Sequence, residues 1–168
     1  DVMTITPVDE DGGFELYLAP GVYTLDAFAP NHVASQTYDV EVGPGMDPVV
    51  AMEIPPSARV LLSVRDQASG TAVPGRVTLY RQGDTPSPHP PSDVQPAPKS
   101  WGGTISAVAY VTADDTEAIV PPGNYRLIAS RGPTWSMHEV AVALEAGPAA
   151  SYTFELEREV DTTGWVSG

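Results

Sequence analysis

The chain has 168 residues, of which 42% are hydrophobic, and its 22 acidic residues outnumber its 8 lysines and arginines to give a formal net charge of −14. So acidic a surface repels nucleic-acid phosphates and anionic lipid, which argues against both as partners. The chain has no cysteine for disulfides or thiolate chemistry, and no run of ~18 apolar residues that would predict a membrane-spanning helix.

Apolar residues at alternate positions dominate the chain and predict β-strands. The alternation begins at residues 14–18, 22–28, 38–42 and 50–54. After Pro55-Pro56 it restarts at residues 58–66 and 75–82, and five shorter runs follow as far as residue 157. The 18 prolines and 15 glycines are spread between these runs, where they favour turns over helices. The sequence therefore predicts an all-β protein.

An internal repeat divides the chain into two parts. The stretch "LAPGVYTLDA" at residues 18–27 realigns with "VPPGNYRLIA" at residues 120–129, a shift of 102 residues. The same shift carries Val40 onto Val142 and Ile54 onto Leu156. Each copy is predicted to be a four-strand unit in which a Pro-Gly turn precedes a strand that begins with an inward-facing tyrosine.

The two copies are unequal, because the long strands predicted at residues 58–66 and 75–82 have no counterpart before the first copy. We therefore predict a tandem Ig-like or prealbumin-like β-sandwich in which the first copy is incomplete. Residues 1–56 form the C-terminal half of one sandwich, and residues 57–159 form a complete seven-strand sandwich. A half sandwich exposes an apolar face and unpaired edges, so we expect residues 1–54 to pack on the second copy or on another molecule.

The proline-rich loop at residues 83–103 is predicted to be a surface insertion between two strands, or a polyproline-II ligand for a partner. Within it, Trp101 stands beside Gly102-Gly103. This ring is a candidate for stacking on a sugar, and the alternative is that it caps the edge of the core.

The residue types needed for chemistry are present but scattered. The histidines, His32, His89 and His138, lie on different segments and lack the spacing of a zinc site. The stretch "DEDGG" at residues 9–13 begins like a calcium loop, but the acid expected about eleven positions on is missing, and a hairpin turn explains it. There is no nucleophile elbow. We expect no catalytic or metal-binding residue and no cofactor in this segment, which is therefore not predicted to be an enzyme.

Arg131 and Trp135 flank a Gly-Pro turn and place a cation and a large ring at one end of the predicted sandwich. Both residue types are favoured as interface anchors. The alternative is that Trp135 packs locally on its own domain.

Two stretches carry a resemblance to a known domain family. "DGGFELYLAPGVYTLDAFAPNH" resembles the carboxypeptidase regulatory-like, or transthyretin-like, β-sandwich, and "VRDQASGTAVPGRVTLY" looks like the opening half of that domain. Such domains are passive modules of many secreted proteins. The resemblance thus implies a periplasmic or extracellular location.

A more specific resemblance lies at the end of the chain. "IVPPGNYRLIASRGPTWS" followed by "VDTTGWVSG" is similar to the region just before the catalytic domain of PHP-type metallohydrolases of the CehA/McbA group. There, a Gly-Trp-x-Ser-Gly stretch runs into an Asp-x-His-x-His strand that supplies metal ligands. The resemblance implies that residues 160–168 link to a catalytic domain with a divalent metal, which this sequence does not contain. It also implies that Gly164 and Trp165 form the junction, with Arg131 and Trp135 on the same inter-domain surface.

The leading hypothesis is a non-catalytic scaffold for a PHP-type metal-dependent hydrolase whose catalytic domain is not in this chain. The alternative is a stand-alone carbohydrate- or protein-binding module, or a stalk, at the cell surface. The expected partners are the missing catalytic domain and, through the incomplete first sandwich, a second copy of the chain. Neither nucleic-acid binding nor membrane insertion is expected.

Overall fold

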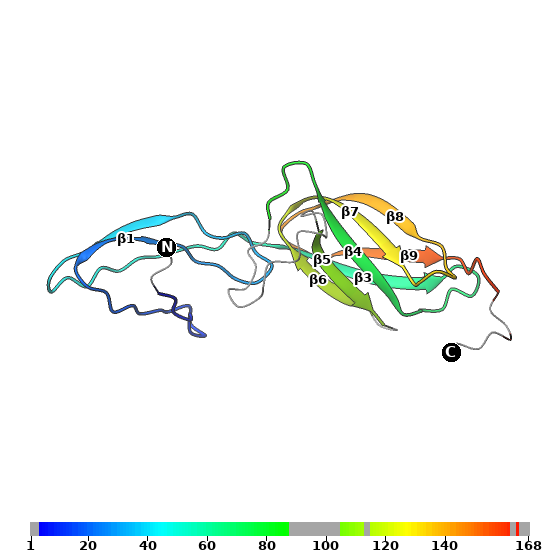
Figure 1. Ribbon diagram of the computed structural model, residues 1–168, viewed down its shortest axis with the longest axis horizontal. Coiled ribbons are helices and arrows are strands. Elements are labelled where there is room, and N and C mark those ends of the chain that lie inside the picture. The colour runs from blue at the N-terminus through cyan, green and yellow to red at the C-terminus, as the bar shows by residue number, and fades with distance from the viewer. Residues whose placement is uncertain (1–3, 88–104, 113–114, 162–163, 165–168) are drawn as a thin grey trace.

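A computed structural model of the chain describes residues 4–87, 105–112, 115–161 and 164, and every regular element within them is a β-strand. The prediction of an all-β protein is confirmed. Two parts follow one another along the chain: a small unit with strands β1 (Gly21–Leu25) and β2 (Tyr38–Val42), and a β-sandwich that begins at residue 58 (Figure 1). His89, Trp101, Trp165 and most of the proline-rich loop lie outside the described residues.

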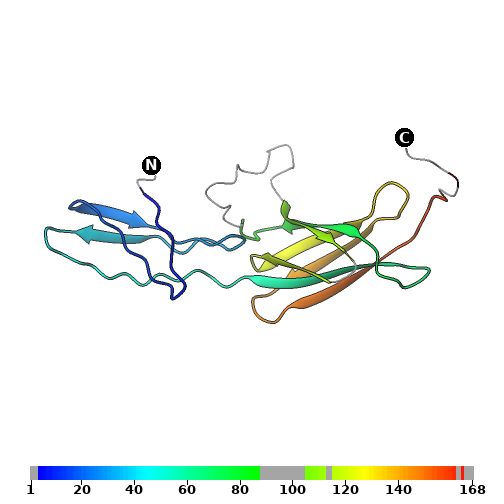
Figure 2. The ribbon, with the colours of Figure 1, turned by 90° about the horizontal axis from the view of Figure 1, so that it is seen from below.

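The described part of the sandwich contains seven strands in two sheets, layered face to face (Figures 1 and 2). One sheet has the order β6-β3-β9 and the other β5-β4-β7-β8. All neighbours are antiparallel except β3 and β9, which run parallel. The strands are β3 (Ala58–Asp66), β4 (Gly75–Gln82), β5 (Ile105–Val111), β6 (Thr116–Val120), β7 (Gly123–Ser130), β8 (His138–Leu144) and β9 (Ala150–Leu156).

The core lies between the two sheets and follows the alternation of the sequence. On β3 the side chains of Val60, Leu62 and Val64 are completely buried, the intervening Leu61 and Ser63 are half-buried, and the flanking Arg59 and Arg65 are exposed. Because successive side chains of a strand point to opposite faces, every second residue reaches the core. The facing sheet and the neighbouring strands contribute the remaining large buried side chains, which include Val77, Leu79, Val120, Tyr125, Leu127, Phe154 and Leu156.

The two ends of the sandwich, which we call its near pole and its far pole, have different neighbours along the chain. At the near pole, where β3 and β9 begin, Ala58 forms a bridge with Ala146 of the β8–β9 connection, and the first unit lies beyond this pole (Figures 1 and 2). At the far pole β3 and β9 end, and the chain leaves the sandwich after Leu156.

The two copies of the sequence repeat also contain the same hairpin structure. Strands β1 and β2 pair from Gly21↔Val42 to Leu25↔Tyr38, and adding 102 to each number gives the pairs of β7 with β8. A tyrosine corner accompanies both hairpins. The hydroxyl of Tyr23 donates to the carbonyl of Ala19, and that of Tyr125 donates to the carbonyl of Pro121, each at 2.7 Å. Both copies therefore share register, turn and tyrosine.

The prediction of four strands in the first copy is wrong. Residues 14–18 and 48–54, all of them described, form no strand, although the same shift carries them onto β6 and β9. In the second copy both β6 and β9 pair only with β3. Among residues 4–56 nothing takes the place of β3, so these two segments lack the ladder partner that would satisfy their backbone groups.

The first unit does not pack on the sandwich in the way that the sequence led us to expect. None of the described residues 4–56 belongs to the core or to the half-buried residues packed against it. The linker between the two parts contacts the first unit, because the hydroxyl of Ser57 donates to the carbonyl of Asn31 at 3.4 Å. Packing of the first unit on another molecule stays a prediction.

The buried tyrosine corner at Tyr125 should contribute more to stability than its half-buried copy at Tyr23. Burial raises the pKa of the Tyr125 hydroxyl above its ordinary value of 10.0, so the group remains a donor at neutral pH. Tyr125→Phe leaves the Pro121 carbonyl without this donor, and we expect a loss of about 1–3 kcal/mol in the free energy of unfolding, measured with urea. The matched variant Tyr23→Phe should change it by less than about 0.5 kcal/mol. Equal losses for the two variants would contradict this assignment.

Candidate functional site

At the far pole, the β7–β8 loop is tied to the segment that leaves β9. The amide of Ser136 donates to the carbonyl of Glu157 at 2.8 Å, and the Ser136 hydroxyl accepts from the Glu157 amide at 2.8 Å. The amide of Glu159 donates to the carbonyl of Thr134 at 3.0 Å. A bridge between Trp135 and Arg158 lies between these bonds. The loop therefore holds the departing chain as a short additional ladder.

Arg131 and Trp135 come together in this loop. The guanidinium carbon of Arg131 lies 4.5 Å from the centroid of the Trp135 ring, which is a cation–π geometry. The turn at Gly132, whose φ is 101°, reverses the chain between them. The Trp135 ring is half-buried and packs against the core. Local packing of Trp135 is thus observed, and a further use of the pair as an interface anchor stays a prediction.

Of the other residues with a predicted role at a surface, Gly164 is described by the structure and Trp101 and Trp165 are not. Gly164 is exposed, with a φ of 84°, beyond the ladder that ends near Val160. Trp165 lies outside the described residues, as does Trp101, so their predicted roles in a junction and in sugar stacking remain predictions.

Sequence reasoning missed the residues that make the tie. Thr134, Ser136 and Glu159 carry no recognisable motif. The 102-residue shift could have located them, because it carries Ser57 onto Glu159 and the loop at residues 29–35 onto residues 131–137. In the first unit Ser57 also contacts this loop, through the carbonyl of Asn31. In both units the departing chain therefore has a hydrogen bond to the equivalent loop, a single one at 3.4 Å in the first unit and several in the second.

Groups that could support chemistry are already engaged in structural roles. The carboxylate of Asp9 accepts from the amides of Asp11 and Gly13 at 3.1 and 2.6 Å, which makes it a turn cap. Nδ1 of His32 lies 2.8 Å from the carbonyl of Pro30, and Nδ1 of His138 lies 3.3 Å from that of Glu155. Within the described part of the chain, no group of three or more acids and histidines is placed to hold a metal ion.

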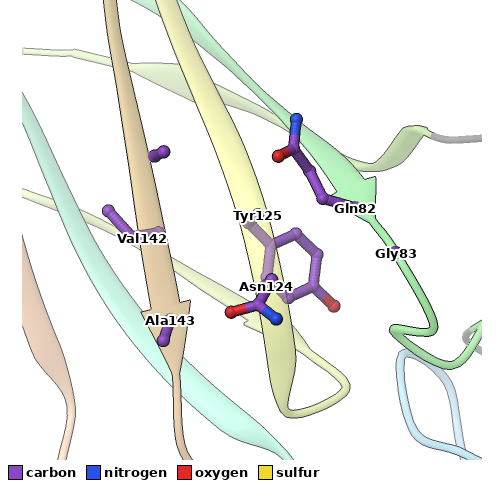
Figure 3. A pocket seen from close by; sticks show the side chains of 7 residues that line it. Gln82, Gly83, Asn124, Tyr125, Val142 and Ala143 are labelled. Carbon is purple, nitrogen blue, oxygen red and sulfur yellow. The ribbon is translucent and has the colours of Figure 1, made fainter.

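A shallow pocket lies at the near pole, between the ends of β4, β7 and β8 (Figure 3). Its lining includes the amide side chains of Gln82 and Asn124, and the ring of Tyr125. The hydroxyl of Tyr125 is already bonded to Pro121, so the pocket offers two side-chain amides and no reactive group. The far pole is therefore the better candidate for a functional surface. Over the described residues, no helix is long and apolar enough to cross a membrane.

Comparisons with known proteins give likenesses to all-β structures and no family. No family model and no curated protein matches the chain. Among solved structures it is similar to the Bacillus anthracis TIE protein, with 15% identity and a TM-score of 0.46, over 90% of this chain and 28% of that one. It is also similar to a streptococcal ancillary pilin, with 12% identity and a TM-score of 0.41, over 84% of this chain and 43% of that one. The chain thus spans less than half the length of either protein.

Removal of the Trp135 ring should destabilise the sandwich, because the ring packs on the core. We expect Trp135→Ala to lower the free energy of unfolding in urea by about 2 kcal/mol, less than for a fully buried tryptophan. Met137 lies in the same loop and is 75% exposed, so Met137→Ala should change it by less than about 0.5 kcal/mol. If the two variants are equally stable, Trp135 is not part of the core packing.

Proposed function

We propose that the chain is a non-catalytic structural segment, a spacer, of a protein in which β-sandwich units follow one another in series. The parallel pairing of β3 with β9 carries this proposal. Both strands begin at the near pole and end at the far pole, with paired residues from Val60↔Ala150 to Asp66↔Leu156. The polypeptide thus enters the sandwich at one pole and leaves at the other. This is the path that a spacer between two neighbours requires.

The same pairing resists tension along the molecule. A force applied at Ser57 and Glu159 draws β3 toward the near pole and β9 toward the far pole, so that the strands must slide past each other. All seven residue pairs of the ladder then bear the force together. β3 is also held on its other side by five pairs with β6. A pull that separated the strands from one end would break the same ladder one pair at a time.

The fastening at the end of each unit supports an arrangement in series. In the first unit, the loop at residues 29–35 contacts the linker that becomes β3, and Pro55-Pro56 restricts the backbone of that linker. In the second unit the equivalent loop holds residues 157–160. By this correspondence, the far pole with Arg131 and Trp135 is the place where a following domain attaches. The resemblance to secreted modules supports a location of such a protein in the periplasm or outside the cell.

A finer form of the proposal identifies the following domain as a PHP-type metal-dependent hydrolase, which would hold the divalent metal. It rests on the resemblance of "VDTTGWVSG" to the stretch before such domains. We predict an Asp-x-His-x-His strand soon after Gly168 in the parent gene, and sequencing of that gene tests it. If the gene continues after Gly168 without this motif, the hydrolase proposal is wrong and the spacer proposal is unaffected.

Single-molecule force spectroscopy can test the spacer directly, because the chain has no cysteine and attachment points can be chosen freely. Ser57→Cys with Glu159→Cys loads β3 and β9 in shear. Ser57→Cys with Pro148→Cys places both handles at the near pole and separates the strands from one end. We expect a several-fold higher unfolding force in the first geometry, because forced unfolding depends on the barrier along the pulling direction.

The two double variants should have the same free energy of unfolding in urea, which serves as the control for their integrity. Equal unfolding forces in the two geometries would show that the β3–β9 pairing carries no special load, and the spacer proposal would lose its support.

A further inference from the structure

Six residues of the first unit occupy positions that form the core in the second unit: Leu16, Leu18, Tyr23, Leu25, Met52 and Ile54. We call them the open face. All six are half-buried. The 102-residue shift carries them onto Ala118, Val120, Tyr125, Leu127, Phe154 and Leu156, which are at most 7% exposed. The sequence therefore provides a core-forming surface in both units, but in the first unit this surface is incompletely covered.

The second unit shows what covers such a surface. β3 lies between β6 and β9, and β4 lies along the edge of β7 that faces away from β8. β3 and β4 are consecutive in the chain, and one lies in each of the two sheets. In the first unit, β1 pairs with β2 alone, and no described residue from 4 to 56 takes the place of either covering strand. The edge of β1 is thus open to an added strand.

We propose that the open face takes a two-stranded segment supplied by the polypeptide that immediately precedes residue 1, and that this segment completes the first sandwich. The order of the repeat indicates the source. The shift places the counterpart of β5 at residues 3–9, and in the second unit β3 and β4 come before β5. Their counterparts therefore belong directly upstream of these residues.

A second copy of the chain fits this surface less well. In each copy β3 already has β6 and β9 as neighbours, and β4 already has β5 and β7. Within the described residues, a second copy therefore has no spare pair of strands of this type to donate. Its own open face presents no strand edge equivalent to β3.

The register of the second unit specifies the chemistry of the incoming strands. In β3, Val60 lies opposite Ala118 and Val64 lies opposite Phe154. The first incoming strand should accordingly place apolar side chains opposite Leu16 and Met52, the counterparts of those two partners. In β4, Leu79 lies opposite Leu127, so the second incoming strand should place an apolar side chain opposite Leu25.

The chain's own residues 58–83 can serve as the probe. We would fuse a copy of them ahead of residue 4 through a flexible Gly/Ser linker, and measure amide hydrogen exchange in peptides covering residues 14–25 and 48–54. New ladder bonds protect amides from exchange, so exchange in both peptides should slow at least about tenfold. The peptides from β7 and β9 are the internal reference and should be unchanged.

Two substitutions separate docking on the open face from non-specific contact. Leu25→Asn in the fusion protein should abolish the new protection, because this side chain points toward the incoming strands. Val22→Asn should leave the protection in place, because Val22 is 75% exposed on the opposite side of β1. Equal exchange in the fused and unfused proteins, or equal effects of the two substitutions, would overturn the proposal.

The source of the strands is tested with the parent polypeptide, extended upstream by about 30 native residues, enough for two strands and a turn. We expect the same protection of residues 14–25 and 48–54. Protection by the fused probe but not by the native extension would overturn the assignment to the preceding segment. So would an unfused chain that sediments as a dimer and becomes a monomer with Leu25→Asn, since the face would then belong to a second copy.

Discussion

Strand β3 is the element on which the rest of the molecule depends. It pairs with β6 on one side and β9 on the other, and its inward residues are completely buried. It also receives the linker from the first unit and fixes the direction in which the chain crosses the sandwich. The first unit shows the consequence of its absence, since two segments with the same alternating sequence form no strand.

The sandwich is stabilised by the burial of its apolar side chains, whereas its charged groups affect mainly its surface properties. The ion pairs recorded among the described residues, Arg59–Glu117 and Arg126–Glu139, lie at the surface, where such pairs contribute little. With a net charge of −14, acidic groups instead repel one another over the surface, which discourages unspecific association between copies. At the far pole, Arg131 stacks on the ring of Trp135.

Much of the fold could be predicted from the sequence because its signals are local. Alternation predicted the β class, and the 102-residue repeat predicted that the Pro-Gly-x-Tyr hairpins would share one structure. The alternation at residues 14–18 and 50–54 was misleading, because a strand also needs a neighbouring strand to pair with. The sequence of a segment does not show whether such a neighbour is present. The hydrogen bonds of Thr134 and Ser136 to residues 157–160 join segments more than twenty residues apart through backbone groups and the Ser136 hydroxyl, so no pattern within either segment reveals them. Only the closeness of Arg131 and Trp135 was readable, since a single turn separates them.

The paired tyrosine corners bear on the order in which such a sandwich folds. In the first unit the β1–β2 ladder and the Tyr23 hydrogen bond are present although β3 and β4 have no counterpart there. The matching β7–β8 hairpin consists of contacts between residues close in sequence, whereas the Ser63–Thr153 contact of β3 with β9 closes a separation of 90 residues. Contacts of long separation form late because closing the chain costs entropy first. We therefore expect the β7–β8 hairpin and the hydrogen bond of its tyrosine to form before the terminal strands β3 and β9 come together.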